Sequence, residues 1–117
     1  MQSAEANQLI LKIQKVLVKD FDTTKLVKHL QELRPFALEE EDPLVTKVIR
    51  LSYEHIAAHQ AFPFMSGFVV DDEGEEIPIE PGEDKENLNY LMELLLKSEN
   101  KFNREEIKEF RTQLKAY

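Results

Sequence analysis

The sequence predicts a mainly α-helical protein, with about five helices packed as an irregular bundle and a short acidic β-hairpin between the third and fourth helices. Three observations predict this class. Apolar residues recur at the 3.6-residue period of a helix over most of the 117 residues. All three glycines and three of the five prolines fall within residues 62–83. Residues 62–86 also hold nine acids against one base, a sum of −8 that equals the net charge of the whole chain.

A length of 117 residues is typical of one domain, and we expect residues 1–117 to form a single helical domain in which residues 62–83 are a non-helical acidic hairpin or loop. The chain has no cysteine, which excludes disulfides and thiolate-ligated metals. Lysines interrupt the apolar stretch near the N-terminus, so no secretory signal is recognised there. Both features are compatible with a cytoplasmic location.

The first helix is expected over residues 4–19, where apolar side chains recur on one face. Leu11 and Val18 add a second apolar strip, seven residues apart, that a single core does not need. Because a symmetric dimer is the commonest way to cover such a strip, the sequence predicts a homodimer through this helix.

The second and third helices are expected over residues 23–34 and 43–61. Asp22 and Asp42 precede them and are good helix caps, since their carboxylates accept hydrogen bonds from unpaired backbone N–H groups. Pro35 is expected to end the second helix, because the residue before a proline avoids helical angles.

The last two helices are expected over residues 84–98 and 104–116, joined by a short link and therefore packed as an antiparallel pair. Asn103 and Glu106 have the spacing of a capping box at the start of the fifth helix. The side chains on the apolar stripes that we expect to be largely buried are Leu9, Ile13, Leu17, Leu30, Ile49, Ile56, Leu91, Leu95 and Phe110.

A β-hairpin is expected over residues 68–79, because two short apolar runs flank Asp72-Glu73-Gly74. That tripeptide is typical of a type I turn followed by a glycine in the left-handed region. Pro78 cannot donate to a strand ladder, so its strand must lie at an edge. The apolar side chains expected to share the face that lies on the helices are Phe68, Val70, Ile77 and Ile79.

The acidic segment admits two interpretations. Runs of charge often do no more than solvate a connecting loop. Long insertions in compact domains are also often functional. The phenylalanines next to the acidic segment favour a binding role for it. We therefore expect a non-enzymatic protein-interaction module that binds a partner protein with a basic surface. The residues expected to contact that partner are Phe64, Phe68, Asp71, Asp72, Glu73, Glu75 and Glu76.

Two other functions stay open. Clustered acids can imitate nucleic acid and inhibit a basic protein. His55 and His59, four residues apart on one helix, are the candidates for a metal site in a His/carboxylate metal-dependent enzyme, although two flanking histidines are more often structural.

The remaining signals exclude several functions. A pI near 4.9 argues against direct nucleic-acid binding and against an anionic membrane surface. No uncharged stretch reaches the length of a membrane span. Nucleophile elbows and glycine-rich phosphate loops are absent, so neither catalysis nor a cofactor is expected.

Overall fold

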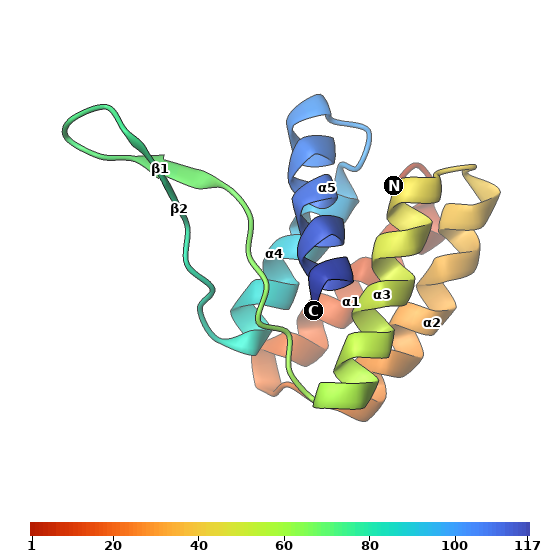
Figure 1. The fold of residues 1–117 in the computed structure, drawn as a ribbon. Helices are drawn as coiled ribbons and strands as arrows, with labels where there is room; N and C mark the ends of the chain where they lie inside the picture. The colour runs from red at the N-terminus through yellow and green to blue at the C-terminus, as the bar shows by residue number, and fades with distance from the viewer.

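The structure, a computed structural model, describes all residues from 1 to 117 and confirms a mainly helical fold with one antiparallel hairpin between the third and fourth helices (Figure 1). In chain order the elements are α1 (Ala4–Lys19), α2 (Thr23–Glu39), α3 (Pro43–His59), β1 (Phe68–Val70), β2 (Glu76–Pro78), α4 (Asp84–Leu96) and α5 (Lys101–Ala116). Figure 1 shows the hairpin standing clear of the helices. None of the five helices combines the length and hydropathy needed to cross a lipid bilayer.

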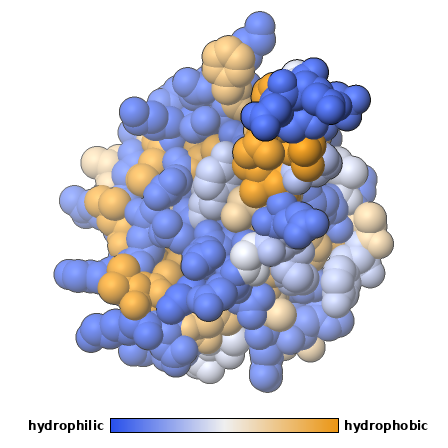
Figure 2. All heavy atoms as spheres, turned by 90° about the vertical axis from the view of Figure 1, so that its left-hand side faces the viewer, coloured by the Kyte–Doolittle hydropathy of each residue, from blue (hydrophilic) through white to orange (hydrophobic).

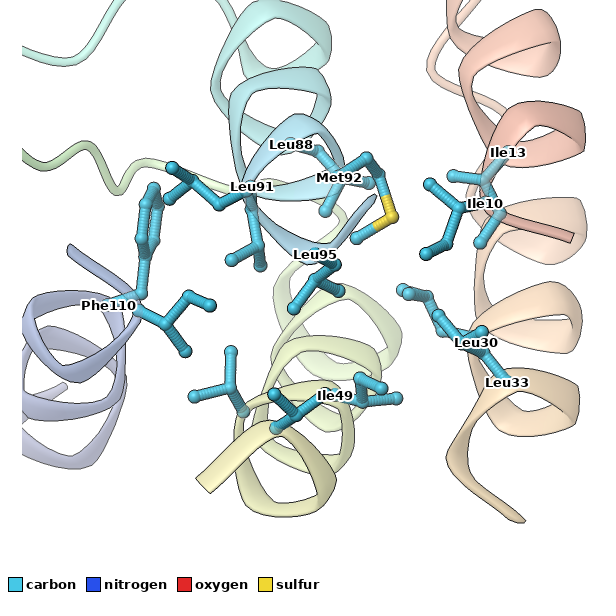
Figure 3. Close-up of a cluster of buried hydrophobic side chains, with 14 of the residues drawn as sticks. Ile10, Ile13, Leu30, Leu33, Ile49, Leu88, Leu91, Met92, Leu95 and Phe110 are labelled. Atoms are coloured by element: carbon cyan, nitrogen blue, oxygen red, sulfur yellow. The ribbon is translucent and has the colours of Figure 1, made fainter. Parts of the chain in front are cut away.

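The helices form a closed ring. α1 packs on α2, α2 on α3, α3 on α5, α5 on α4, and α4 back on α1. Their apolar faces meet in one connected core of 24 buried residues, and Figure 3 shows side chains such as Ile10, Leu30, Ile49 and Phe110 converging there from different helices. Eight of the nine side chains predicted to be buried are buried, and Leu9 is partly buried at the edge of the core.

The predicted caps of α2 and α3 are confirmed. The Asp22 carboxylate accepts a hydrogen bond from the backbone N–H of Lys25 at 3.1 Å, and that of Asp42 accepts one from Val45 at 3.2 Å. These bonds satisfy N–H groups that have no partner within the first turn of a helix. The start of each helix is therefore fixed by a local signal that is visible in the sequence.

The predicted end of α2 is wrong, because the helix continues through Pro35 to Glu39. An internal proline removes one helical hydrogen bond and is destabilising. The turn that follows packs Phe36 against the core and buries Ala37 completely, so apolar burial offsets this cost. The helix ends at Glu39, and Glu41, two residues further on, has a φ of 54° in the left-handed region.

The predicted cap of α5 is also wrong, since the helix begins at Lys101 and its cap is Asn100. The Asn100 side chain accepts hydrogen bonds from the N–H groups of Phe102 and Asn103 at 2.9 and 3.2 Å. Asn103 instead donates its side-chain amide to the carbonyls of Leu94 and Lys97, at the end of α4. These hydrogen bonds connect the start of α5 to the end of α4. α3 and α4 each end two residues before the predicted bound, at His59 and Leu96.

The hairpin has the predicted turn but not the predicted orientation. The N–H of Gly74 donates to the carbonyl of Asp71 at 3.1 Å, and Gly74 has a φ of 83°. The strands pair Phe68 with Pro78 and Val69 with Ile77. Directly paired residues share a face, so Phe68 and Ile77 lie on opposite faces and not on one. Neither face lies on the helices, because every residue of both strands is exposed.

Candidate functional site

The segment between α3 and α4 has a packed part and a projecting part. Residues 62–66 lie against the helices, where Phe62, Phe64 and Ser66 are buried. Residues 68–79, called the arm below, extend away from the ring of helices (Figure 1). The candidate site is the arm together with the contacts that hold its base.

Phe64, one of the predicted contact residues, lies in the core. Its ring packs edge-on against His55, with ring centroids 4.8 Å apart, and also contacts the rings of Phe62 and Tyr117. The apolar character that made this residue a candidate is explained by core packing. Phe64 is therefore removed from the predicted binding surface.

Asn87, a buried residue in α4, forms hydrogen bonds to both ends of the segment between α3 and α4. Its amide nitrogen donates to the carbonyls of Phe62 and Gly82 at 2.9 and 3.1 Å, and its amide oxygen accepts from the N–H of Gly82 at 2.8 Å. The carboxylate of Asp84 accepts from the N–H of Phe62 at 3.0 Å. The chain thus leaves and rejoins the helices at one fixed place.

A carboxylate of α5 holds the base of the arm. Glu106 accepts hydrogen bonds from the hydroxyl of Ser66 at 3.1 Å and from the hydroxyl of Tyr90 at 2.6 Å. Burial, followed by this hydrogen bond to Glu106, raises the pKa of Tyr90 to about 12. The Tyr90 hydroxyl therefore keeps its proton, and its hydrogen bond to Glu106, further into the alkaline range than an ordinary tyrosine would.

Two further residues of α5 bind the backbone beside Ser66. Glu109 accepts from the N–H of Gly67 at 3.2 Å, and the Gln113 amide donates to the carbonyl of Met65 at 2.7 Å. Glu106, Glu109 and Gln113 are spaced three and four residues apart and so lie on one side of the helix. These three residues are called the anchor below. The only sign of the anchor in the sequence is this polar stripe beside the apolar stripe of α5, and the sequence analysis did not identify it.

Gly67 is the point at which the chain turns from the helices into the arm. Its φ of 95° lies in a region that residues with a side chain rarely adopt. A Cβ atom at this position would lie 3.0 Å from the Glu106 carboxylate and 3.3 Å from the side chain of Ile79. Glycine therefore allows both the turn and the close approach of the anchor.

The arm exposes apolar side chains on both of its faces. The exposed fractions are 51% for Phe68, 52% for Val69, 68% for Val70, 45% for Ile77 and 38% for Ile79. The register places Phe68 and Val70 on one face and Val69 and Ile77 on the other. Figure 2, which faces the side from which the arm projects, shows hydrophobic atoms beneath a cap of hydrophilic ones.

The acids at the tip have two different roles. Asp72, Glu73, Glu75 and Glu76 are exposed and form no ion pair. Asp71 is partly buried, and its carboxylate accepts from the N–H groups of Glu73 and Glu75 at 2.9 and 2.8 Å. Asp71 therefore builds the turn, whereas the other four acids present charge to solvent.

One strand of the arm has a complete unpaired edge. The N–H of Ile79 bonds to the carbonyl of Gly67, and that of Asp71 bonds to the carbonyl of Glu75. Because backbone groups alternate in direction along a strand, the N–H and C=O groups of Phe68 and Val70 point away from β2. The outer edge of β2 lacks a donor at Pro78. The edge of β1 is thus the better template for another strand.

His55 and His59 lie together at the end of α3, with ring centroids 4.5 Å apart. The ring of Tyr117 packs edge-on against both, at 4.5 and 5.0 Å. Burial, and next the neighbouring His59, lower the pKa of His55. No third histidine, aspartate or glutamate joins them in a group that could hold a metal ion.

No protein-family model, curated protein or solved structure matches this chain.

Proposed function

We propose that this chain is a non-enzymatic protein-interaction module that binds a partner protein with a basic surface through the arm. The observation that carries the proposal is the exposure of apolar side chains on both faces of a hairpin that stands away from its own core. An isolated two-stranded hairpin is marginally stable in water and gains from packing on something. A partner that covers the arm would supply that packing.

The mode of binding that fits the arm is addition of a strand. A strand of the partner pairs with the outward N–H and C=O groups of Phe68 and Val70, and its side chains cover the apolar faces of the arm. The four exposed acids at the tip attract a basic surface and speed the encounter. Backbone pairing then supplies affinity, while charge supplies orientation.

The deciding comparison is affinity capture from the native extract with the intact chain and with an armless variant. Because the carbonyl of Gly67 and the N–H of Ile79 lie 3.1 Å apart, a two-residue Asn-Gly turn can replace residues 68–78 and close the gap. We expect a partner that the intact chain retains and the armless variant does not. A captured protein that binds both with equal affinity contradicts the proposal.

Two variants, one single and one fourfold, separate the contribution of backbone pairing from that of charge once a partner is purified. Val70→Pro removes an outward N–H without touching the bonds to β2, so it should slow or abolish strand addition. Neutralising Asp72, Glu73, Glu75 and Glu76 should slow association, and salt should diminish the difference. The matched control neutralises four exposed acids outside the arm, which are Glu5, Glu39, Glu93 and Glu105. Duplex DNA that competes for the same partner would favour the nucleic-acid-mimicking inhibitor instead.

We further propose that the module acts in the cytoplasm, which a chain without cysteine suits, and that it forms a homodimer through α1. The support for the dimer is the exposed apolar strip of Leu11 and Val18 on that helix.

A further inference from the structure

A second feature, away from the arm, is a cleft between α2 and α3 with a volume of about 380 Å³. Three bases line it, Arg34 from α2 and Lys47 and Arg50 from α3. Two acids line it as well, Glu41 and Asp42. The size falls within the range of small-molecule sites. Bases outnumber acids in this cleft by three to two, whereas the chain as a whole has a net charge of −8.

The charges of this cleft are only partly neutralised within the protein. Asp42 is paired with Arg104 through contacts of 2.9 and 3.1 Å, and Arg50 is paired with Glu54 at 3.0 Å. Arg34 and Lys47 form no ion pair. These two bases therefore keep their charge available to a ligand.

Helix α5 adds two more bases beside Lys47. α3 lies between α2 and α5 (Figure 1), and Lys115 and Arg111 of α5 are close enough for their charges to act on Lys47. Repulsion from Lys115, followed by burial and by the charges of Arg50 and Arg111, lowers the pKa of Lys47. Like charges held this close destabilise one another, and an anion among them removes that repulsion.

The guanidinium of Arg34 has a donor that the protein does not satisfy. Its Nε nitrogen is buried and has no hydrogen-bond acceptor in the protein. A buried donor without an acceptor is unfavourable, and for a charged group the penalty is larger. The Arg34 side chain therefore gains a hydrogen bond if it turns this nitrogen toward an acceptor in the cleft.

We propose that the cleft formed by Arg34, Lys47 and Arg50, with Arg111 and Lys115 at its side, binds a small, multiply charged oxyanion. The planar guanidinium of an arginine binds a phosphate or carboxylate through two parallel hydrogen bonds, and a lysine adds a compact positive charge. This site is separate from the arm, so it does not depend on the function proposed above.

The test is an NMR titration of the full chain, in which backbone amide shifts follow sodium pyrophosphate and, separately, sodium citrate, with sodium chloride matching the ionic strength. We expect saturable shifts centred on Arg34, Lys47 and Arg50 for at least one probe. The tighter probe shows whether phosphate or carboxylate is the preferred group. Shifts that never saturate, or that sodium chloride reproduces, overturn the proposal.

Variants make the test specific. Lys47→Gln, at a partly exposed position that does not threaten folding, should weaken binding about tenfold, and Arg34→Gln should do the same. Glu41→Gln should tighten binding, because it removes an opposing charge from the cleft. The matched control is Lys28→Gln, which removes one charge from an exposed lysine outside the cleft. An equal loss of affinity in the control and in the cleft variants would reduce the effect to general electrostatics and overturn the proposal.

Discussion

Asp42 makes two stabilising contacts at the start of α3. Its carboxylate caps the helix by accepting from the N–H of Val45, and it also accepts from both terminal nitrogens of Arg104, 62 positions along the chain. Burial alone would raise the pKa of Asp42, but the hydrogen bonds from Arg104 and from the backbone outweigh it and lower the pKa. One residue thus joins a local helix signal to a contact between α3 and α5.

These contacts predict a pH-dependent stability. Because the folded pKa of Asp42 lies below its usual 3.8, its contribution is present above that pH and is lost as the pH falls through the folded value. Asp42→Ala should cost about 1–3 kcal/mol of unfolding free energy at neutral pH. Asp42→Asn, which keeps a capping oxygen, should cost less. Urea denaturation at neutral and acidic pH measures both.

The pH dependence of the urea denaturation also tests whether the charge of Asp42 is the cause. In acid the native Asp42 is protonated, so the gap between the native chain and Asp42→Asn should narrow. A gap that stays constant with pH would mean that the charge of Asp42 does not contribute.

At the scale of the element, capping residues visible in the sequence set the starts of α2 and α3. Contacts between helices set the start of α5 and the end of α2. Asp22 and Asp42 could be recognised as caps because a cap needs only its own helix. Asn100 and Asn103 are chemically equal candidates, and the choice between them depends on the carbonyls of α4 that Asn103 reaches. The helix through Pro35 likewise depends on burial of Ala37 against the other helices.

For the candidate site, the sequence predicted the arm, its turn and its acids, but neither its faces nor its anchor. The register was already implied by the turn, because a three-residue loop at 72–74 sets Asp71 against Glu75 and hence Val69 against Ile77. The anchor could not be predicted in the same way. Contacts of Glu106 and Glu109 with residues about 40 positions earlier depend on how α5 packs in the ring.

The acids of the arm should not be needed for folding. Asp72, Glu73, Glu75 and Glu76 form no ion pair, and like charges this close repel one another. Changing all four to Asn or Gln should therefore leave the melting temperature unchanged or raise it slightly. Asp71→Ala is the contrasting variant, because it removes two hydrogen bonds within the turn and should loosen the hairpin.

Circular dichroism melting and amide shifts of residues 68–79 would follow the two variants. Ready unfolding of the four-acid variant would show that these acids are structural. An unchanged hairpin in Asp71→Ala would show that its carboxylate is dispensable to the turn.

At the scale of the whole molecule, the ring of five helices depends on side chains that reach its centre. Ile13, Leu95 and Phe110 are completely buried and come from three different helices. Each change to Ala should cost about 2–5 kcal/mol, through lost burial and the cavity left behind. Leu11→Ala is the matched control, since that side chain is half exposed and should cost less than about 0.5 kcal/mol. Urea denaturation gives the differences, and losses below about 1 kcal/mol at all three buried sites would contradict this core.

The exposed strip on α1 leads to the last prediction, a weak homodimer. Leu11 and Val18 are 54% and 82% exposed, and their spacing of seven residues puts them on one side of the helix. A two-fold axis across this strip would cover both residues in each copy. Lys12 and Lys15 flank the strip, so a dimer brings four lysines together and repulsion keeps the association weak.

Salt should therefore strengthen the dimer, whereas it should weaken binding by the acidic arm. Light scattering on a sizing column, at rising protein and salt concentration, measures this directly. Leu11→Ser with Val18→Ser should give a monomer of unchanged stability, because neither side chain belongs to the core. If the chain stays monomeric at high micromolar concentration and high salt, the predicted dimer through α1 is wrong.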